Sequence, residues 1–174
     1  MRGTGSYFLV TVLDAYSRYV VHWELLTTMT ASDVRLVLQQ ALEVTGAHPK
    51  LVTDNGSQFT AAEFKDLMRR FSVEHIRIRT RHPESNELVE RFHRSAREAP
   101  ADDELGTLFR TRELIHVWVE EYSERRLRAG LGYLTPADFY RGDPLARRTD
   151  RAEKLDRAGA ERRRLKQERL RAAA

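Results

Sequence analysis

Two carboxylates, Asp54 and Glu90, are placed where a divalent cation could be held, with thirty-five residues between them. Asp54 ends a short apolar strand expected over residues 50–53, and Glu90 falls one turn into a helix expected over about 86–98. Mg²⁺ and Mn²⁺ take oxygen ligands, and two-metal phosphodiester chemistry holds its ions about 3.5–4 Å apart. The spacing alone leaves two hypotheses open, a metal site and two solvated acids.

Basic side chains surround Glu90 in the sequence. Four precede it and four follow it: Arg77, Arg79, Arg81 and His82, then Arg91, His93, Arg94 and Arg97. Arg94 lies one helical turn after Glu90 and on the same face. Cations beside carboxylates suit a site for DNA, whose backbone is a polyanion. A salt-bridged, exposed helix face has the same pattern, so this observation is also compatible with a structural role.

The segment after Asp54 does not continue as a hairpin. Asn55-Gly56 is a strong hairpin signal when alternating strands flank it, but the residues beyond it have helical spacing. A capping box over residues 60–63 predicts a helix start, and apolar residues follow at helical intervals: Phe64, Leu67, Met68 and Phe71. Asp54 is therefore expected at the junction of a strand and a turn.

The remaining pattern predicts an α/β fold. Residues 6–26 are expected to form a β-hairpin with a polar turn at 14–18, and a helix follows from about Ser32 to Gly46. Further predicted elements are a strand at about 74–79, a long helix at about 104–125 and a helical turn near Pro136. This order gives a mixed sheet flanked by helices, and open sheets place ligands beyond the carboxyl ends of their strands. Asp54 has that position.

Composition places the chain among globular proteins with a charged extension. It has 174 residues, 41% hydrophobic and 32% charged, with no cysteine, so thiolate zinc sites and disulfides are excluded. No apolar run reaches the ~18–20 residues of a membrane span. The C-terminal residues 147–174 carry eleven basic and five acidic side chains, a surplus of six, in a net charge of +4. We expect this tail to be a solvated helix or a disordered arm.

Four ordered blocks between about Tyr7 and Gly142 resemble the catalytic core of insertion-sequence transposases, the branch similar to retroviral integrases. They are YFLVTVLDAYSRYVVHWEL, LVTDNGSQF, RHPESNELVERFHRS and RRLRAGLGYLTPADFY. The resemblance implies an RNase H-like core over residues 6–142 and an Asp–Asp–Glu triad that binds two Mg²⁺ (or Mn²⁺) ions for DNA strand transfer. It further implies transposon and target DNA as partners, a homo-oligomer when active, no membrane association and a bacterial cytoplasmic, nucleoid-associated location.

By motif, Asp54 resembles the family's second Asp and Glu90 its Glu, so both are expected to be catalytic metal ligands. The resemblance also assigns DNA contacts to residues around these two acids: Asn55, Gly56, Arg81, Ser85, Asn86, Arg91 and Arg94. The family's first Asp sits on a strand before the hairpin, and we expect the chain to begin after that strand. Asp14 is expected to be a turn residue instead.

The missing first Asp bears on activity, and two alternatives to an inactive transposase remain. With two of three ligands, the 174 residues are expected to be inactive in strand transfer. One alternative is a non-catalytic DNA-binding remnant that uses the tail and the arginines near Glu90. Another is a related nuclease that completes its site with Glu87, which stands where the family usually has Gly. At this position the Glu87 carboxylate could stabilise the helix through its macrodipole. It could instead repel DNA phosphates and raise the proton affinity of the Glu90 carboxylate.

Overall fold

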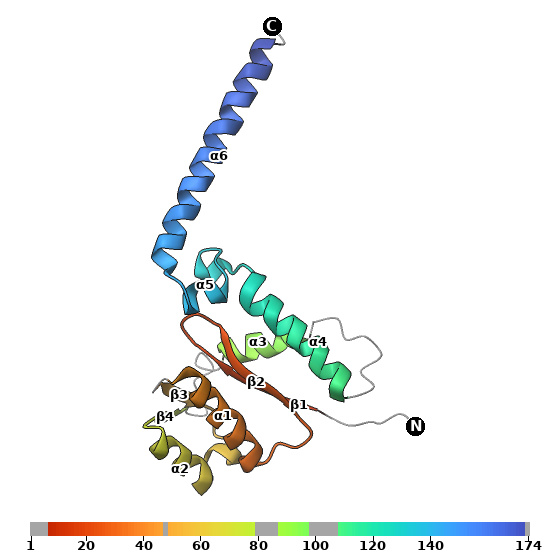
Figure 1. The fold of residues 1–174 in the computed structure, drawn as a ribbon, viewed down its shortest axis with the longest axis vertical. Helices are drawn as coiled ribbons and strands as arrows, with labels where there is room; N and C mark the ends of the chain where they lie inside the picture. The colour runs from red at the N-terminus through yellow and green to blue at the C-terminus, as the bar shows by residue number, and fades with distance from the viewer. Residues whose placement is uncertain (1–6, 47–48, 79–86, 98–107, 173–174) are drawn as a thin grey trace.

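The computed structural model describes residues 7–46, 49–78, 87–97 and 108–172 (Figure 1). Its strands are β1 (Phe8–Leu13), β2 (Val20–Leu26), β3 (Lys50–Thr53) and β4 (Glu74–Arg77). Its α-helices are α1 (Ala31–Thr45), α2 (Ala62–Arg70), α3 (Glu87–Arg97), α4 (Leu108–Glu120), α5 (Pro136–Tyr140) and α6 (Pro144–Ala172). The predicted α/β class is confirmed.

The first two strands form the predicted antiparallel hairpin. Phe8 lies opposite Leu26 and Val12 opposite His22, and the register shifts between Val12 and Leu13. The turn is held by Asp14, whose Oδ2 accepts hydrogen bonds from the backbone N–H and the hydroxyl of Ser17. Asp14 therefore shapes the turn, as the sequence predicted.

Helix α1 is capped at both ends. Thr30 and Asp33 form a reciprocal capping box, and Gly46 ends the helix in the left-handed conformation with φ of 58°. Its buried stripe contains five apolar residues: Val34, Val37, Leu38, Ala41 and Leu42. This stripe gives one wall of the cavity described below.

Strands β3 and β4 pair in parallel, with α2 as the crossover between them, so their carboxyl ends lie at one edge. The predicted capping box at residues 60–63 is wrong. The N-cap of α2 is Ala61, which has no side-chain cap, and the Thr60 hydroxyl donates to the Ser57 carbonyl instead. A short 3₁₀ turn, Ser57–Phe59, precedes the helix. Thr60 is its C-cap, and the Thr60 backbone N–H donates to the Ser57 carbonyl.

Strand pairing is divided between two ladders. Among the described residues, β1 pairs with β2 and β3 pairs with β4, and no ladder joins the two pairs. The sequence predicted the hairpin and a single mixed sheet. Figure 1 shows α1 and α2 with the β3–β4 pair, and α3 and α4 on the other side of the hairpin.

Two apolar clusters hold these layers. The first joins α1 and α2 through the buried residues Leu38, Leu42, Phe64, Leu67, Met68 and Val73. The second joins the hairpin, α3 and α4 through Val20, Phe92, Val119 and Tyr122, with Trp118 packed against it. Phe92 is 1% exposed and lies edge-on to Tyr122, so the inner face of α3 is fixed by aromatic packing.

The chain ends in a long, polar helix. Helix α6 runs for 29 residues and projects from the body of the molecule (Figure 1). Its first turns are anchored, since Arg148 stacks on Phe139 and Arg151 donates to the Tyr133 carbonyl. The rest is almost entirely exposed, and ion pairs one turn apart, such as Asp150–Lys154, stabilise it modestly.

Candidate active site

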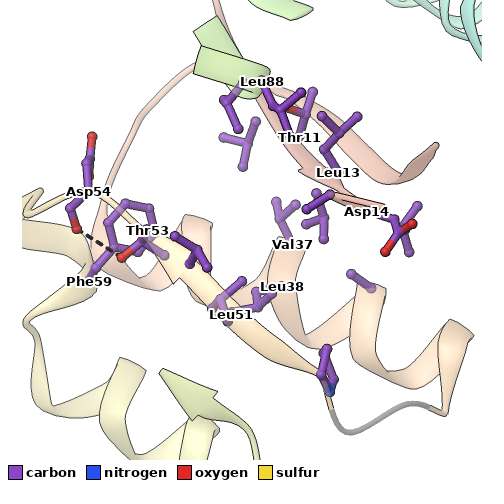
Figure 2. A pocket seen from close by; sticks show the side chains of 18 of the residues that line it. Thr11, Leu13, Asp14, Val37, Leu38, Leu51, Thr53, Asp54, Phe59 and Leu88 are labelled. Carbon is purple, nitrogen blue, oxygen red and sulfur yellow. Dashed lines mark hydrogen bonds between the residues drawn. The ribbon is translucent and has the colours of Figure 1, made fainter. Parts of the chain in front are cut away.

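Asp54 and Glu90 line the same cavity, which has a volume of about 1260 Å³. Most of its lining comes from β1, α1, β3 and α3, and β4 contributes Ile76 and Arg77. Figure 2 shows Thr11 and Leu13 on one side, Leu51 and Thr53 on the other, and Leu88 of α3 above them. The structure thus brings together, around one space, the two acids that the sequence singled out.

Asp54 stands directly after β3 and is held by its own turn. Its Oδ1 accepts a hydrogen bond of 2.9 Å from the Gly56 backbone N–H, while the side chain as a whole remains exposed. Asn55 donates from Nδ2 to the Ile78 carbonyl at 2.7 Å, which ties the turn to the chain after β4. One carboxylate oxygen of Asp54 is therefore fixed by the backbone, and among the described residues Oδ2 makes no hydrogen bond.

Glu90 lies in the first turn of α3, exposed and beside cationic side chains. Arg94 and Arg97 follow it along α3, and both line the cavity together with Arg77 from β4. The same helix buries Phe92 against the hairpin and α4, which fixes its rotation and leaves Glu90 exposed at the cavity. The acids and three arginines thus share one region, where the cations could bind phosphate oxygens.

Two histidines near the site, His75 and His93, have lowered pKa values. Burial lowers the pKa of His93, and the neighbouring Arg97 lowers it further. Burial also lowers the pKa of His75, with a smaller contribution from Arg77. His93, one of the basic side chains that follow Glu90 in the sequence, lines the cavity. It lies three residues after Glu90, a spacing that places both side chains on the same face of α3.

Of the other described residues predicted to contact DNA, only some line the cavity. Arg91 is paired with Glu87 one turn before it, and neither residue lines the cavity, whereas Arg94 does. Asn55 and Gly56 form the turn beside Asp54. The predictions for Arg81, Ser85 and Asn86 lie outside the described residues.

The donor set around the two acids is incomplete in the described part of the chain. No group of three His, Cys, Asp or Glu residues there is arranged to hold a metal ion. Asp14 also lines the cavity, but its carboxylate is engaged by Ser17. Asp54 and Glu90 are oxygen donors of the kind that Mg²⁺ and Mn²⁺ prefer, so the residues present fit part of such a site.

Two models of the integrase core domain match the chain, one over residues 1–83 and a second over residues 71–136. Together they extend through the hairpin, both strands of the parallel pair, and α3 to the start of α5. The chain belongs to the integrase core domain family. Its predicted resemblance to insertion-sequence transposases is confirmed, and its resemblance to retroviral integrases is confirmed for the fold.

Relatives of this integrase core include transposases. It is 29% identical over 139 residues to the transposase of insertion sequence IS904 from Lactococcus lactis, covering 78% of the chain and 55% of that protein. It is 23% identical over 135 residues to the transposase InsK of IS150 from Escherichia coli, described as putative, covering 76% of the chain and 48% of that protein. The chain thus spans about half the length of these two relatives.

Solved retroviral integrases have the same fold. The HTLV-2 integrase catalytic core, determined in complex with magnesium, matches with a TM-score of 0.60 at 18% identity, over 76% of this chain and 83% of that one. The catalytic core of BIV integrase matches with a TM-score of 0.61 at 21% identity, over 77% and 85%. These values establish the RNase H-like fold. Among the described helices, none combines the length and hydropathy needed to span a membrane.

Proposed function

We propose that this integrase core takes part in DNA transposition as a Mg²⁺- or Mn²⁺-dependent strand-transfer module. Asp54 and Glu90 are the two catalytic carboxylates in this proposal, and each supplies oxygen ligands to the metal. The observation that carries it is the shared cavity, which both acids line although thirty-five residues separate them. Family membership and the similarity to transposases of insertion sequences support the choice of DNA as substrate.

In this proposal the acids bind the metal and the arginines bind DNA phosphates. Asp54 is held by the Gly56 N–H through Oδ1, and Oδ2 would be the oxygen that it offers to a cation. Arg94, Arg97 and Arg77 bind and position the DNA phosphates along the cavity. Two bound Mg²⁺ ions would activate the attacking oxygen and stabilise the leaving oxygen of the phosphodiester.

The proposed DNA contacts extend beyond these arginines. Asn55 and Gly56 present the turn beside the metal, and Arg91 adds a cation one residue after Glu90. Because Arg91 is paired with Glu87, DNA must compete for it with that carboxylate, and Glu87 is then a weakening neighbour instead of a third ligand. Arg81, Ser85 and Asn86 remain proposed contacts from the sequence resemblance.

The module is proposed to be incomplete by itself. Two carboxylates leave the geometry of a two-metal site unfixed, and the described residues offer no third acid to Asp54 and Glu90. We therefore expect no strand transfer from this chain alone. In its active form we expect a homo-oligomer on DNA in the bacterial cytoplasm, consistent with the dimeric and trimeric forms in which the HTLV-2 core was solved.

The decisive experiment is joining of labelled DNA carrying the transposon end to a target plasmid, in Mg²⁺ and in Mn²⁺. The chain alone should give no product above background. Joining that is abolished by Glu90→Gln or Asp54→Asn, but not by Asp66→Asn on the remote helix α2, would refute the proposed inactivity while supporting the two catalytic residues. Joining that survives both site variants would refute the assignment of the site.

A second candidate function is DNA binding without catalysis, favoured by α6. From Glu161 onward this exposed helix carries six basic and two acidic side chains, the basic ones being Arg162, Arg163, Arg164, Lys166, Arg169 and Arg171. Such a helix binds phosphates with little sequence preference. DNA binding that is independent of Mg²⁺ and lost with the α6 cations would favour this function over the catalytic one.

A further inference from the structure

A second, smaller pocket lies next to the cavity that Asp54 and Glu90 line. Its volume is about 430 Å³, within the ~300–1,000 Å³ that is typical of sites for small ligands. Ala15 at the tip of the hairpin and Leu88 of α3 line both spaces, so the two are neighbours. The other walls come from the 3₁₀ turn η4 (Ala129–Leu131), from α5 and from the start of α6. Figure 1 shows α5 and the start of α6 beside the hairpin tip.

The smaller pocket has two cations and no acid in its described lining. Arg18 and Arg148 are the only charged residues there, and neither forms an ion pair with another described residue. A guanidinium group presents its donors in a planar fork that matches the oxygens of a phosphate or a carboxylate. Two such groups without a counter-charge therefore favour an anionic ligand.

Two glycines make room for these guanidinium groups. A Cβ at Gly130 would lie 2.8 Å from Nη2 of Arg18, and a Cβ at Gly132 would lie 3.1 Å from Nε of Arg148. Gly132 also has a φ of 68°, a left-handed conformation that favours glycine by itself. Gly130 is not in that region, so its missing side chain provides only space. The turn η4 is thus shaped around the guanidinium of Arg18.

A third guanidinium adds positive charge near Arg18. Arg128 lies with Cζ 4.0 Å from the centroid of the Tyr122 ring, and its Nε and Nη2 atoms are buried without a hydrogen-bond partner. Burial lowers the pKa of the Arg128 guanidinium, although the phenol of Tyr122 opposes this effect. The neighbouring charges of Arg126 and Arg18 lower that pKa further. An anion bound at Arg18 would offset the repulsion between these cations.

The rest of the pocket wall is apolar and aromatic. Tyr16 packs against Phe139 with 5.6 Å between the ring centroids, yet Tyr16 remains 70% exposed. Three leucines complete this part of the wall: Leu88, Leu131 and Leu145. An exposed aromatic ring beside arginines offers a surface on which a flat ligand group can stack. The pocket therefore combines an anion site with a stacking surface.

We propose that this pocket binds one unpaired nucleotide of a DNA strand, with its phosphate on Arg18 and Arg148 and its base against Tyr16. A nucleotide carries an anionic group and a flat aromatic group in one unit, which matches the two halves of the pocket. A base inside a duplex could not enter, because its faces are stacked and its edge is paired. The inference deepens the proposed function, on which it rests for the strand that leads from the cavity into the pocket. Nucleotide binding itself requires neither metal nor the two acids.

The test follows the amide signals of the ¹⁵N-labelled full chain during titration with deoxyadenosine 5′-monophosphate (dAMP) in EDTA. Saturable shifts should appear at Ala15, Gly130, Leu131 and Arg148 and should be absent at Lys65 on α2. Inorganic phosphate alone and deoxyadenosine alone should each bind about tenfold more weakly or worse, because each keeps only half of the contacts. Binding of either fragment as tight as that of dAMP would overturn the two-part site.

Two competitors identify the class of ligand. A thymidine tetranucleotide should displace dAMP, whereas a blunt duplex of ten base pairs at the same nucleotide concentration should not. Equal displacement by the duplex, or none by the single strand, would overturn the assignment to an unpaired nucleotide of DNA. Acetyl-Phe-Asp-amide that binds as tightly as dAMP would overturn it in favour of a protein carboxylate.

Matched glycine variants test the position of Arg18 without changing any charge. Gly130→Ala displaces the Arg18 guanidinium and should weaken dAMP binding at least fivefold. Gly159→Ala on α6, where a Cβ would lie 3.8 Å from Nη1 of Arg163, should change binding less than twofold. Equal effects of the two substitutions would overturn the proposal.

Charge variants give an independent measurement. Arg18→Gln and Arg148→Gln should each weaken dAMP binding about tenfold, because each removes a charged hydrogen-bond donor. Lys65→Gln, which removes an exposed cation on α2, should change it less than twofold. The dispersion of the amide spectrum shows in the same experiment that each variant is folded, and unchanged binding in both folded arginine variants would overturn the proposal.

Failure of the pocket can be distinguished from failure of the proposed function. Absent dAMP binding with Mn²⁺ binding at Asp54 and Glu90 intact would overturn the pocket alone. Intact dAMP binding without Mn²⁺ binding would refute the metal site and would support the pocket.

Discussion

Asp54 and Glu90 line one cavity although they come from different layers of the molecule. Asp54 follows β3, which packs with α1 and α2, whereas Glu90 is on α3, which packs on the hairpin and α4 through Phe92. Whether the two acids meet at the cavity therefore depends on the position of the α1–α2 cluster relative to the cluster of the hairpin, α3 and α4. A loosened second cluster would move Glu90 without disturbing the turn that holds Asp54.

Mn²⁺ binding should reveal the two carboxylates directly. If Asp54 and Glu90 donate oxygen to the ion as proposed, titrating Mn²⁺ into the ¹⁵N-labelled chain should broaden the amide signals around Gly56 and Glu90 before others. Asp54→Asn should remove the broadening at Gly56 and weaken it at Glu90 severalfold. Asp66→Asn, an exposed acid paired with Arg69 on α2, provides the control and should leave the pattern unchanged. Broadening at Gly56 that persists in Asp54→Asn would contradict the assignment.

DNA binding through α6 should be visible in its salt dependence. Replacing three cations of the distal helix by Ala, at Arg162, Arg163 and Lys166, should lower the slope of log K against log[salt] by as much as about 2.7, since each phosphate contact contributes about 0.9. The matched variant removes three cations from α2, at Lys65, Arg69 and Arg70. If both triple variants lower the slope equally, binding follows net charge and not α6.

The helix caps offer a stability test with an internal control. Thr30→Ala should lower the free energy of unfolding by about 1 kcal/mol, because the capping box with Asp33 is lost. Thr60→Ala should cost less than about 0.5 kcal/mol, because Thr60 does not cap α2 and bonds only within an exposed turn. Urea unfolding of both variants measures the difference. A reversed order would mean that α2 begins at Thr60 in solution.

Stability should fall with acidity through His75 and His93. Burial depresses the pKa of both imidazoles in the folded state, so the unfolded chain binds more protons between the folded pKa and the unfolded value of about 6.5. Their contribution is complete above pH ~6.5 and is lost as the pH falls through the folded pKa values. Urea unfolding at pH 5 and 7.5 should show a smaller difference in the double variant His75→Gln/His93→Gln. An unchanged difference would mean that other groups dominate.

Local pattern was sufficient for several elements. The hairpin, the helix that ends at Gly46 and the strand at Lys50–Thr53 were predicted because alternation and helical spacing reflect burial directly. The prediction of the α2 cap was wrong, since a 3₁₀ turn competed for Thr60. Local sequence contains both options, and the choice between them depends on how the turn packs.

The sequence by itself determined the identity of the two acids, the turn after Asp54 and the family, because each depends on residue types at fixed spacing. Only the tertiary structure decided that Asp54 and Glu90 face one cavity, that Glu87 is engaged with Arg91, and that β1 and β3 stand apart across an open layer. These relationships join segments that are distant in the chain, and they result from which apolar faces pack together, a property that no local pattern encodes.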